Sequence, residues 1–270
     1  MTEPAIKPNL GNNDPEPKDK EELAEGTLIS HLIELRQRLV KATLGILVVF
    51  LCLVPFAQEI FEMISAPLRE ALPEGSTMIV TGIATPFLTP FKTTLFVALF
   101  LAMPIVLYQI WRFVAPGLYR KERRFAIPLL ASSIVLFYTG VAFAYFVVFR
   151  LVFVFFISVT PESVTNMPDI NEYLSFALTI FFAFGIAFEV PIATFMLIWS
   201  GLVSIKTLAG VRPYIFLGAF VVGMFLTPPD VLSQTMLAMP MYALYEAGLL
   251  MARYLLPEKT QAVQTEDGAD

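Results

Sequence analysis

The sequence contains one cysteine and one histidine, Cys52 and His31, and acids, lysines and arginines make up only 15% of its 270 residues. A single cysteine excludes a disulfide within the chain, and neither residue has the neighbours that a metal site requires. There is no nucleophile–base arrangement and no glycine-rich phosphate loop. We therefore expect no enzyme activity, no metal and no cofactor. His31 is better explained as an interfacial side chain than as a proton shuttle.

Apolar residues, by contrast, are abundant. They make up 57% of the chain and raise its mean hydropathy to +0.71, which is too much apolar surface for one soluble core to bury. Residues 93–111 and 126–149 carry no formal charge at all. About 20 apolar residues cross a hydrocarbon core of about 30 Å, so each stretch predicts a transmembrane helix. The turn between them, 111–124, is rich in arginine, which places it on the cytoplasmic side.

Six spans are predicted in this way, over 42–58, 93–111, 126–149, 173–200, 214–226 and about 231–252. Of the 18 lysines and arginines, all but Arg69, Lys92 and Arg150 then lie on one side, so both termini are predicted to be cytoplasmic. The fold class is an all-α integral membrane protein. Pro191 is expected to bend the long fourth span. Helices five and six are expected to be short, which implies local thinning of the bilayer.

The remaining segments follow from composition. Residues 1–27 are polar and proline-rich and are predicted to form a disordered cytoplasmic tail without a cleavable signal peptide. Residues 28–256 form the membrane domain, which includes an external cap at about 59–92 and a cytoplasmic loop at about 112–125. An amphipathic stretch, 27–41, leads into the first span. Residues 257–270 are a second cytoplasmic tail.

Two acids lie at the predicted cytoplasmic surface. Glu34 is four residues before Arg38, and such a helical pair contributes about 0.3–0.5 kcal/mol on an exposed surface. Glu122 differs, because no cation stands three or four residues away on either side. The basic residues beside it stabilise its ionised form but leave its oxygens available to an external donor.

Three further acids lie in or beside the spans. Glu189 stands among phenylalanines, where an ionisable group is costly, so it is either a functional residue or a buried acid that supports the Pro191 bend. These two interpretations are equally good. Glu246 is expected to pair with Arg253, seven residues further along the same face. Asp230 follows two prolines and is expected to cap span six at its N-terminus.

Several segments together resemble one family, TatC, the multispanning receptor component of the twin-arginine protein translocase. They are HLIELRQRL (31–39), SAPL (65–68), WRFVAPGLYRKERR (111–124), FAFGIAFEVP (182–191) and FVVGMFLTPPDVLSQT (220–235). The resemblance implies a six-helix bundle with a concave face in the bacterial cytoplasmic (inner) membrane. It also implies export of folded proteins that is driven by the proton-motive force.

The resemblance also implies roles for individual residues. Signal-peptide binding is expected at Glu34, Arg36, Phe113 and Glu122. Glu189 is the expected intramembrane acid of the concave face. Contacts with partner helices are expected at Met224, Thr227 and Gln234. Structural or functional positions are expected at Pro67 and Asp230.

The expected partners are TatA- and TatB-type single-span proteins, folded precursors with twin-arginine signal peptides, membrane lipid and further copies of the chain, and not nucleic acid. Two alternatives belong to other functional classes. A proton-coupled small-solute transporter would use Glu189 and would take up solute without partners. A structural membrane scaffold would have no affinity for signal peptides.

Overall fold

The computed structural model describes residues 17–70, 78–114, 126–159, 167–227 and 230–256, and these parts of the chain are almost entirely helical. The helices in chain order are α1 (Pro17–Leu53), α2 (Ala57–Glu70), α3 (Thr85–Val114), α4 (Ala126–Phe143), α5 (Arg150–Val159), α6 (Ile170–Ala187), α7 (Val190–Trp199), α8 (Ile205–Gly210), α9 (Arg212–Leu226) and α10 (Val231–Leu255). A 3-10 turn (Val54–Phe56) joins α1 to α2, and a π-helical stretch (Ala144–Phe149) joins α4 to α5.

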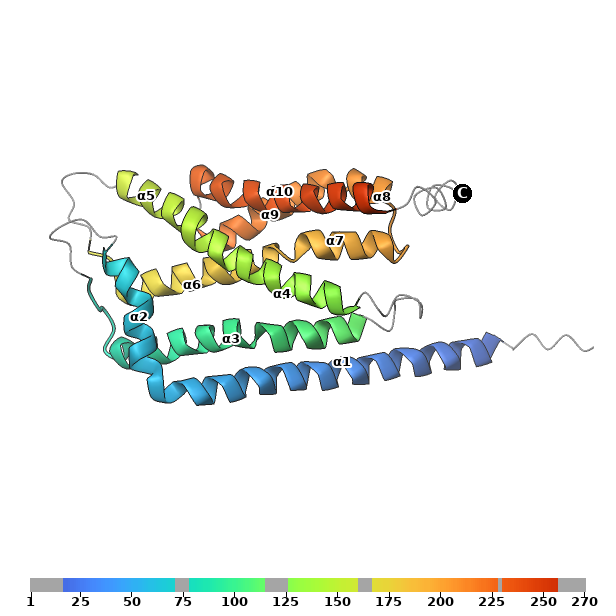
Figure 1. Ribbon diagram of the computed structural model, residues 1–270, viewed down its shortest axis with the longest axis horizontal. Helices are drawn as coiled ribbons and strands as arrows, with labels where there is room; N and C mark the ends of the chain where they lie inside the picture. The colour runs from blue at the N-terminus through green and yellow to red at the C-terminus, as the bar shows by residue number, and fades with distance from the viewer. Residues whose placement is uncertain (1–16, 71–77, 115–125, 160–166, 228–229, 257–270) are drawn as a thin grey trace, which may run out of the picture.

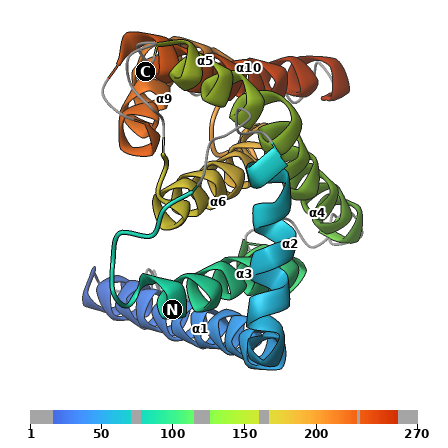
Figure 2. The same cartoon turned by 90° about the vertical axis from the view of Figure 1, so that its left-hand side faces the viewer.

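The long helices run roughly along one axis, with α1 and α3 at one edge of the bundle and α9 and α10 at the other (Figure 1). Seen from the end that carries α2, α6 lies between these edges and α4 lies to one side of it (Figure 2). Among the described elements, α1 packs mainly on α3, α6 on α4, and α10 on both α7 and α9.

Four helical stretches are long and apolar enough to cross a membrane: Leu32–Ala66, Thr85–Phe113, Ile127–Phe156 and Ile170–Trp199. They contain the first four predicted spans, and the third extends past the predicted boundary at residue 149. The fifth predicted span matches α9, a short apolar helix of 15 residues, or about 22 Å. The sixth lies in α10, which has 25 residues, or about 37 Å, so helix six is not short as we expected; it carries Glu246 in its second half. The protein is thus a helical, multi-pass membrane protein.

The N-terminal boundary differs from the predicted one. Helix α1 begins at Pro17, so residues 17–27, which we expected in the tail, continue the helix of the first span. Along the membrane part of α1, large apolar side chains such as Leu39, Leu44 and Leu51 are exposed. A helix with this pattern is suited to a lipid environment on most of its circumference.

The packing of α4 on α6 depends on two glycines. A Cβ atom on Gly140 would lie 2.5 Å from the backbone oxygen of Phe184, and one on Gly185 would lie 2.5 Å from the Phe137 ring. Phe137 and Phe184 are completely buried at this crossing. Small residues let membrane helices approach closely. Alanine at either glycine would overpack the contact, at a cost of about 1–3 kcal/mol.

The fourth span is broken where the sequence predicts a bend. Helix α6 ends at Ala187 and α7 begins at Val190, with Pro191 in the first turn of α7. Proline cannot donate a backbone hydrogen bond, and its ring displaces the carbonyl four residues earlier. The break leaves Glu189 at the junction of α6 and α7.

The external cap ties two distant loops together. Ile79 forms an isolated parallel bridge with Asp169, in which the Ile79 amide donates to the Pro168 carbonyl at 3.2 Å. The Thr81 amide and hydroxyl both donate to Asp169 Oδ2, at 2.9 and 2.5 Å. Asp169 also caps α6, because its Oδ1 accepts from the Asn171 amide. One carboxylate thus links the segment before α3 to the start of α6.

Candidate functional site

A cavity of about 590 Å³ lies between α3 and the broken α6–α7 span. Its walls are almost wholly apolar and include Leu99, Met103, Phe182 and Ile186. Within the described residues, Glu189 is the one ionisable side chain that lines it. A volume of this size is typical of ligand sites that combine an apolar wall with a few polar groups. The cavity is suited to an apolar chain or helix that carries one polar group.

Glu189 has one oxygen without a partner. Its Oε1 is buried and accepts no hydrogen bond from any residue within the described ranges. A buried carboxyl oxygen without a hydrogen bond costs free energy, because it has lost its contacts with water and gained no partner. The break before Pro191 places this acid on the cavity wall.

A hydrogen bond joins α3 to Ser133 of α4. Trp111, near the end of α3, donates its indole N–H to Ser133 Oγ at 2.9 Å. Ser133 is completely buried, whereas Trp111 also lines the cavity. Sequence analysis missed both residues, because a serine and a tryptophan in separate uncharged spans give no sign that they meet.

Three of the four predicted signal-peptide residues lie within the described residues, on the neighbouring helices α1 and α3. Glu34 lies in α1, and its Oε1 accepts from Arg38 Nη2 at 2.6 Å, which confirms the predicted pair. Arg36 lies in the same turn of α1 and is exposed. Phe113 is in the last turn of α3, which packs alongside α1. Glu122 lies outside the described residues.

The three predicted partner-contact residues surround the turn between α9 and α10. Met224 is 48% exposed and presents its side chain to the surroundings. Thr227 is buried, and its hydroxyl donates to the Gly223 carbonyl at 3.0 Å. Gln234, in the first turn of α10, lies against Gly223. Of the three, Met224 is therefore the side chain best placed for contact with another helix.

Asp230 caps α10, as predicted. Its Oδ1 accepts from the Ser233 amide at 2.7 Å, and its Oδ2 accepts from the Ser233 hydroxyl. These hydrogen bonds lower the pKa of Asp230 below its usual value, with the hydroxyl contributing most. Such a cap contributes about 1 kcal/mol to a helix. Pro67, the other predicted structural position, lies in α2.

Glu246 pairs with Arg212, a partner that the sequence analysis did not predict. Glu246 Oε1 lies 2.7 Å from Arg212 Nε, and Oε2 accepts from Arg212 Nη2 at 2.9 Å. The Tyr242 hydroxyl also donates to Oε1, at 2.8 Å. Arg212 opens α9, which packs along α10, so this pair joins two neighbouring helices. Both oxygens of Glu246 are thereby occupied.

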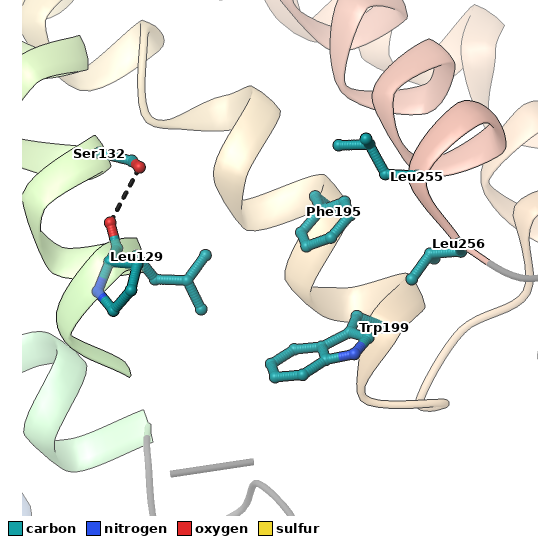
Figure 3. A pocket seen from close by; sticks show the side chains of 7 residues that line it. Leu129, Ser132, Phe195, Trp199, Leu255 and Leu256 are labelled. Atoms are coloured by element: carbon teal, nitrogen blue, oxygen red, sulfur yellow. Dashed lines mark hydrogen bonds between the residues drawn. The ribbon is translucent and has the colours of Figure 1, made fainter. Parts of the chain in front are cut away.

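A second, smaller cavity of about 280 Å³ lies between the ends of α4, α7 and α10 (Figure 3). Its lining includes Leu129, Phe195, Trp199 and Leu256 and none of the predicted site residues. Ser132 lies on this wall and donates to the Pro128 carbonyl at 2.9 Å, as the dashed line shows. The adjacent serines of α4 thus have different surroundings, since Ser132 borders this cavity and Ser133 accepts a hydrogen bond from Trp111.

Comparison with known proteins identifies the family. Residues 30–240 match the family described as Sec-independent protein translocase protein (TatC). A relative of that name from Azotobacter chroococcum mcd 1 is 61% identical over 222 residues, which are 82% of this chain and 87% of the relative. The Escherichia coli (strain K12) relative is 55% identical over 227 residues, or 84% and 88%.

A solved structure has the same fold. The crystal structure of a twin-arginine translocase receptor, TatC, superimposes with a TM-score of 0.76 at 37% identity, and the match covers 83% of this chain and 98% of that one. Residues 30–240, which match the family, include the cavity, the α6–α7 break and the end of α9 and start of α10. No finding supports a small-solute transporter. The chain therefore belongs to the TatC family of Sec-independent protein translocase proteins.

Proposed function

We propose that this protein is the receptor subunit of a twin-arginine translocase, which binds the signal peptides of folded precursors and passes those precursors to single-span partners for export. The observation that carries the proposal is the match along 83% of the chain to a solved twin-arginine translocase receptor. The chain lies in the bacterial inner membrane and crosses it six times, with both termini in the cytoplasm. The distribution of lysine and arginine supports this orientation.

Signal-peptide binding takes place at the cytoplasmic end of α1 and α3. A twin-arginine peptide brings two planar guanidinium groups, which bind carboxylates through paired hydrogen bonds. Glu34 already holds one guanidinium, because Arg38 Nε and Nη2 both donate to its Oε1. An incoming arginine replaces Arg38 or uses the other carboxyl oxygen, and Glu122 supplies the second carboxylate. Arg36 and Phe113 border the same surface.

The apolar part of the peptide or of a partner helix enters the large cavity. Its wall offers apolar contact along α3 and α6, and Glu189 offers the single polar group. An ionisable side chain at this depth normally faces protein or a polar group. Glu189 therefore acts after signal recognition, as a contact for a polar side chain on an otherwise apolar helix.

The α9–α10 corner is the contact site for TatA- and TatB-type partners. Helix α9 exposes a row of large apolar side chains, including Phe225, beside Met224. Its length of about 22 Å is less than the usual hydrocarbon thickness, so the bilayer thins beside it. Thr227 and Gln234 fix the shape of the corner, and Asp230 fixes the start of α10. Energy comes from the proton-motive force.

The proposal is tested by precursor binding. Glu34→Ala and Glu122→Ala are each expected to weaken pull-down of a twin-arginine precursor, and the double variant is expected to lose it almost completely, because two guanidinium groups need two carboxylates. Glu59→Ala, which removes an exposed acid from α2 at the other end of the bundle, is the matched control. Unaltered binding in the double variant would contradict this assignment of the site.

A second assay, photocrosslinking, distinguishes a receptor from a scaffold. Photocrosslinking from positions beside Glu34 in wild-type membranes is expected to capture a signal peptide with paired arginines and to fail with paired lysines. Lysine carries the charge but lacks the planar fork. Equal capture of both peptides, or of neither, would overturn the receptor function.

A further inference from the structure

We infer that Lys92, together with Ser175, binds the phosphate of an anionic phospholipid whose acyl chain fills the large cavity while no helix occupies it. The site lies where α3 and α6 begin, at the end of the bundle that carries α2 (Figure 1). The inference does not depend on the proposed function, because it concerns only this chain and the membrane around it.

Lys92 is an exposed cation without an acidic partner in the described part of the chain. Its Nζ donates to Ser175 Oγ at 2.5 Å, a contact that joins α3 to α6. The ion pairs within 4 Å among the described residues are those of Arg38 and Arg212, so no carboxylate neutralises Lys92. An ammonium group has three protons to donate, and Ser175 takes one of them. Two donors and a full positive charge remain for an anion.

The position of Lys92 is inside the second span and not at its end. It lies seven residues after Thr85, where α3 begins, which is about 10 Å along the helix. A charged side chain at such a position normally faces a polar group, and the long stem of lysine lets its charge reach toward the interface. Nearer the start of both helices, Thr89 Oγ1 lies 3.4 Å from Asn171 Oδ1. Within the described residues, both side-chain hydrogen bonds between α3 and α6 thus lie near this end.

The large cavity continues along the same faces of α3 and α6. On α3, Leu99 lines the cavity seven residues after Lys92. On α6, Phe182 lines it seven residues after Ser175. Seven residues are about two helical turns, or about 10 Å, so both members of each pair lie on one face of their helix. The cation is therefore followed, along both helices, by an apolar cavity.

This order of groups matches a phospholipid, in which an anionic phosphate is followed by an apolar chain. Lysine is a common phosphate ligand, and basic sites between membrane helices bind lipid head groups. Ile110, Ile186 and Leu197 line the cavity and are each at least 40% exposed, so a chain from the surrounding lipid can enter it. An anionic lipid is favoured over a zwitterionic one, because the ammonium group of the latter competes with Lys92 for the phosphate.

The test locates the lipid with a photoreactive probe. The purified full-length chain is reconstituted in phosphatidylcholine vesicles with a small fraction of phosphatidylglycerol that carries a photoreactive group in its acyl chain. Mass spectrometry is expected to find the label on the peptides that contain Leu99 and Phe182. Lys92→Gln keeps a donor for Ser175 but removes the charge, and it is expected to reduce this labelling about ten-fold, as follows from a lost hydrogen bond to a charged group. Lys92→Arg, which keeps the charge, should retain the labelling.

Two further variants separate the charge from the cavity. Lys206→Gln, which removes an exposed cation from α8, is the matched control and should keep full labelling. Ala193→Phe fills the cavity from α7 while Lys92 is intact, and it should lose the labelling. Unchanged labelling in Lys92→Gln, or equal labelling by photoreactive phosphatidylcholine, would overturn the inference, because the cavity would then hold any acyl chain. Absence of labelling in the wild type would also overturn it and would favour a helix that brings a carboxylate to Lys92.

Discussion

Glu246 and Glu189 are both acids within membrane helices, yet their surroundings are opposite. Glu246 receives Arg212 on both oxygens and Tyr242 on one of them, so it joins the start of α9 to α10. Glu189 keeps one buried oxygen, Oε1, without a hydrogen-bond partner within the described residues. The first acid stabilises the fold with its hydrogen bonds, whereas the second retains its capacity for a ligand.

This difference gives a way to separate structural from functional acids in a membrane protein. Removing one member of an ion pair between helices destabilises the fold, because the other charge is left without compensation. Removing an acid whose buried oxygen has no hydrogen-bond partner is not expected to lower the folding stability. The two substitutions therefore affect different quantities, namely folding stability and transport.

The largest effect is expected from Glu189→Ala. Export of a folded twin-arginine reporter should fall at least about ten-fold, since a polar contact inside an apolar site is lost. Precursor binding and the melting temperature of the purified protein should not fall, because the removed oxygen had no partner. Glu189→Gln separates a hydrogen bond, which it keeps, from a charge, which it removes. Loss of precursor binding in Glu189→Ala would place this residue in an earlier step.

A moderate effect is expected from Glu246→Ala. Arg212 and Tyr242 would lose their acceptor, so the melting temperature should fall by a few degrees and α9 should loosen from α10. The reversed pair, Arg212→Glu with Glu246→Arg, should recover part of the loss. Lys206→Ala, an exposed cation of α8, is the control. A melting temperature equal to that of the wild type would show that the pair is not a structural link.

The smallest effect is expected at Asp169, an external carboxylate whose partners are all neutral. Its pKa is lowered below the usual 3.8, mainly by the Thr81 hydroxyl and then by the Thr81 amide. A lowered pKa means that its contribution is complete above about pH 4 and is lost as the pH falls through the lowered value. Asp169→Asn should speed hydrogen exchange at the Thr81 amide at neutral pH.

At a pH below the lowered pKa of Asp169, the wild-type protein and Asp169→Asn should exchange the Thr81 amide at the same rate, because the wild-type carboxyl is then protonated. The Thr85 amide, which donates to Gly82 and not to Asp169, provides an internal control. If exchange at Thr81 is the same in both proteins at neutral pH, the carboxylate does not close the cap.

Local features of this protein were predictable from sequence, and contacts between helices were not. The Glu34–Arg38 pair, the Asp230 cap and the break at Pro191 each depend on residues within four positions of one another. Helical periodicity and proline chemistry are enough to predict them. The same holds for the spans, which depend on uninterrupted apolar length.

The missed contacts depend on how helices are placed. Glu246 was assigned to Arg253 because that residue lies on the same helix, yet the ion pair that the sequence did not predict is with Arg212, 34 positions away. Trp111 and Ser133 are 22 positions apart, and the residues of the Thr81–Asp169 contact are 88 apart. No periodicity within one helix encodes the rotation of its neighbour, which is set by contacts such as those of Gly185 with Phe137.

The most direct test of the account is photocrosslinking from the cavity. A photoreactive residue at Ile186, which is exposed and lines the cavity beside Glu189, should capture a single-span partner in the assembled translocase. A probe at the exposed Tyr254, in the last turn of α10, controls for random capture. The account predicts that capture from Ile186 is lost with Glu189→Ala and kept with Glu246→Ala. Undiminished capture in Glu189→Ala would contradict it.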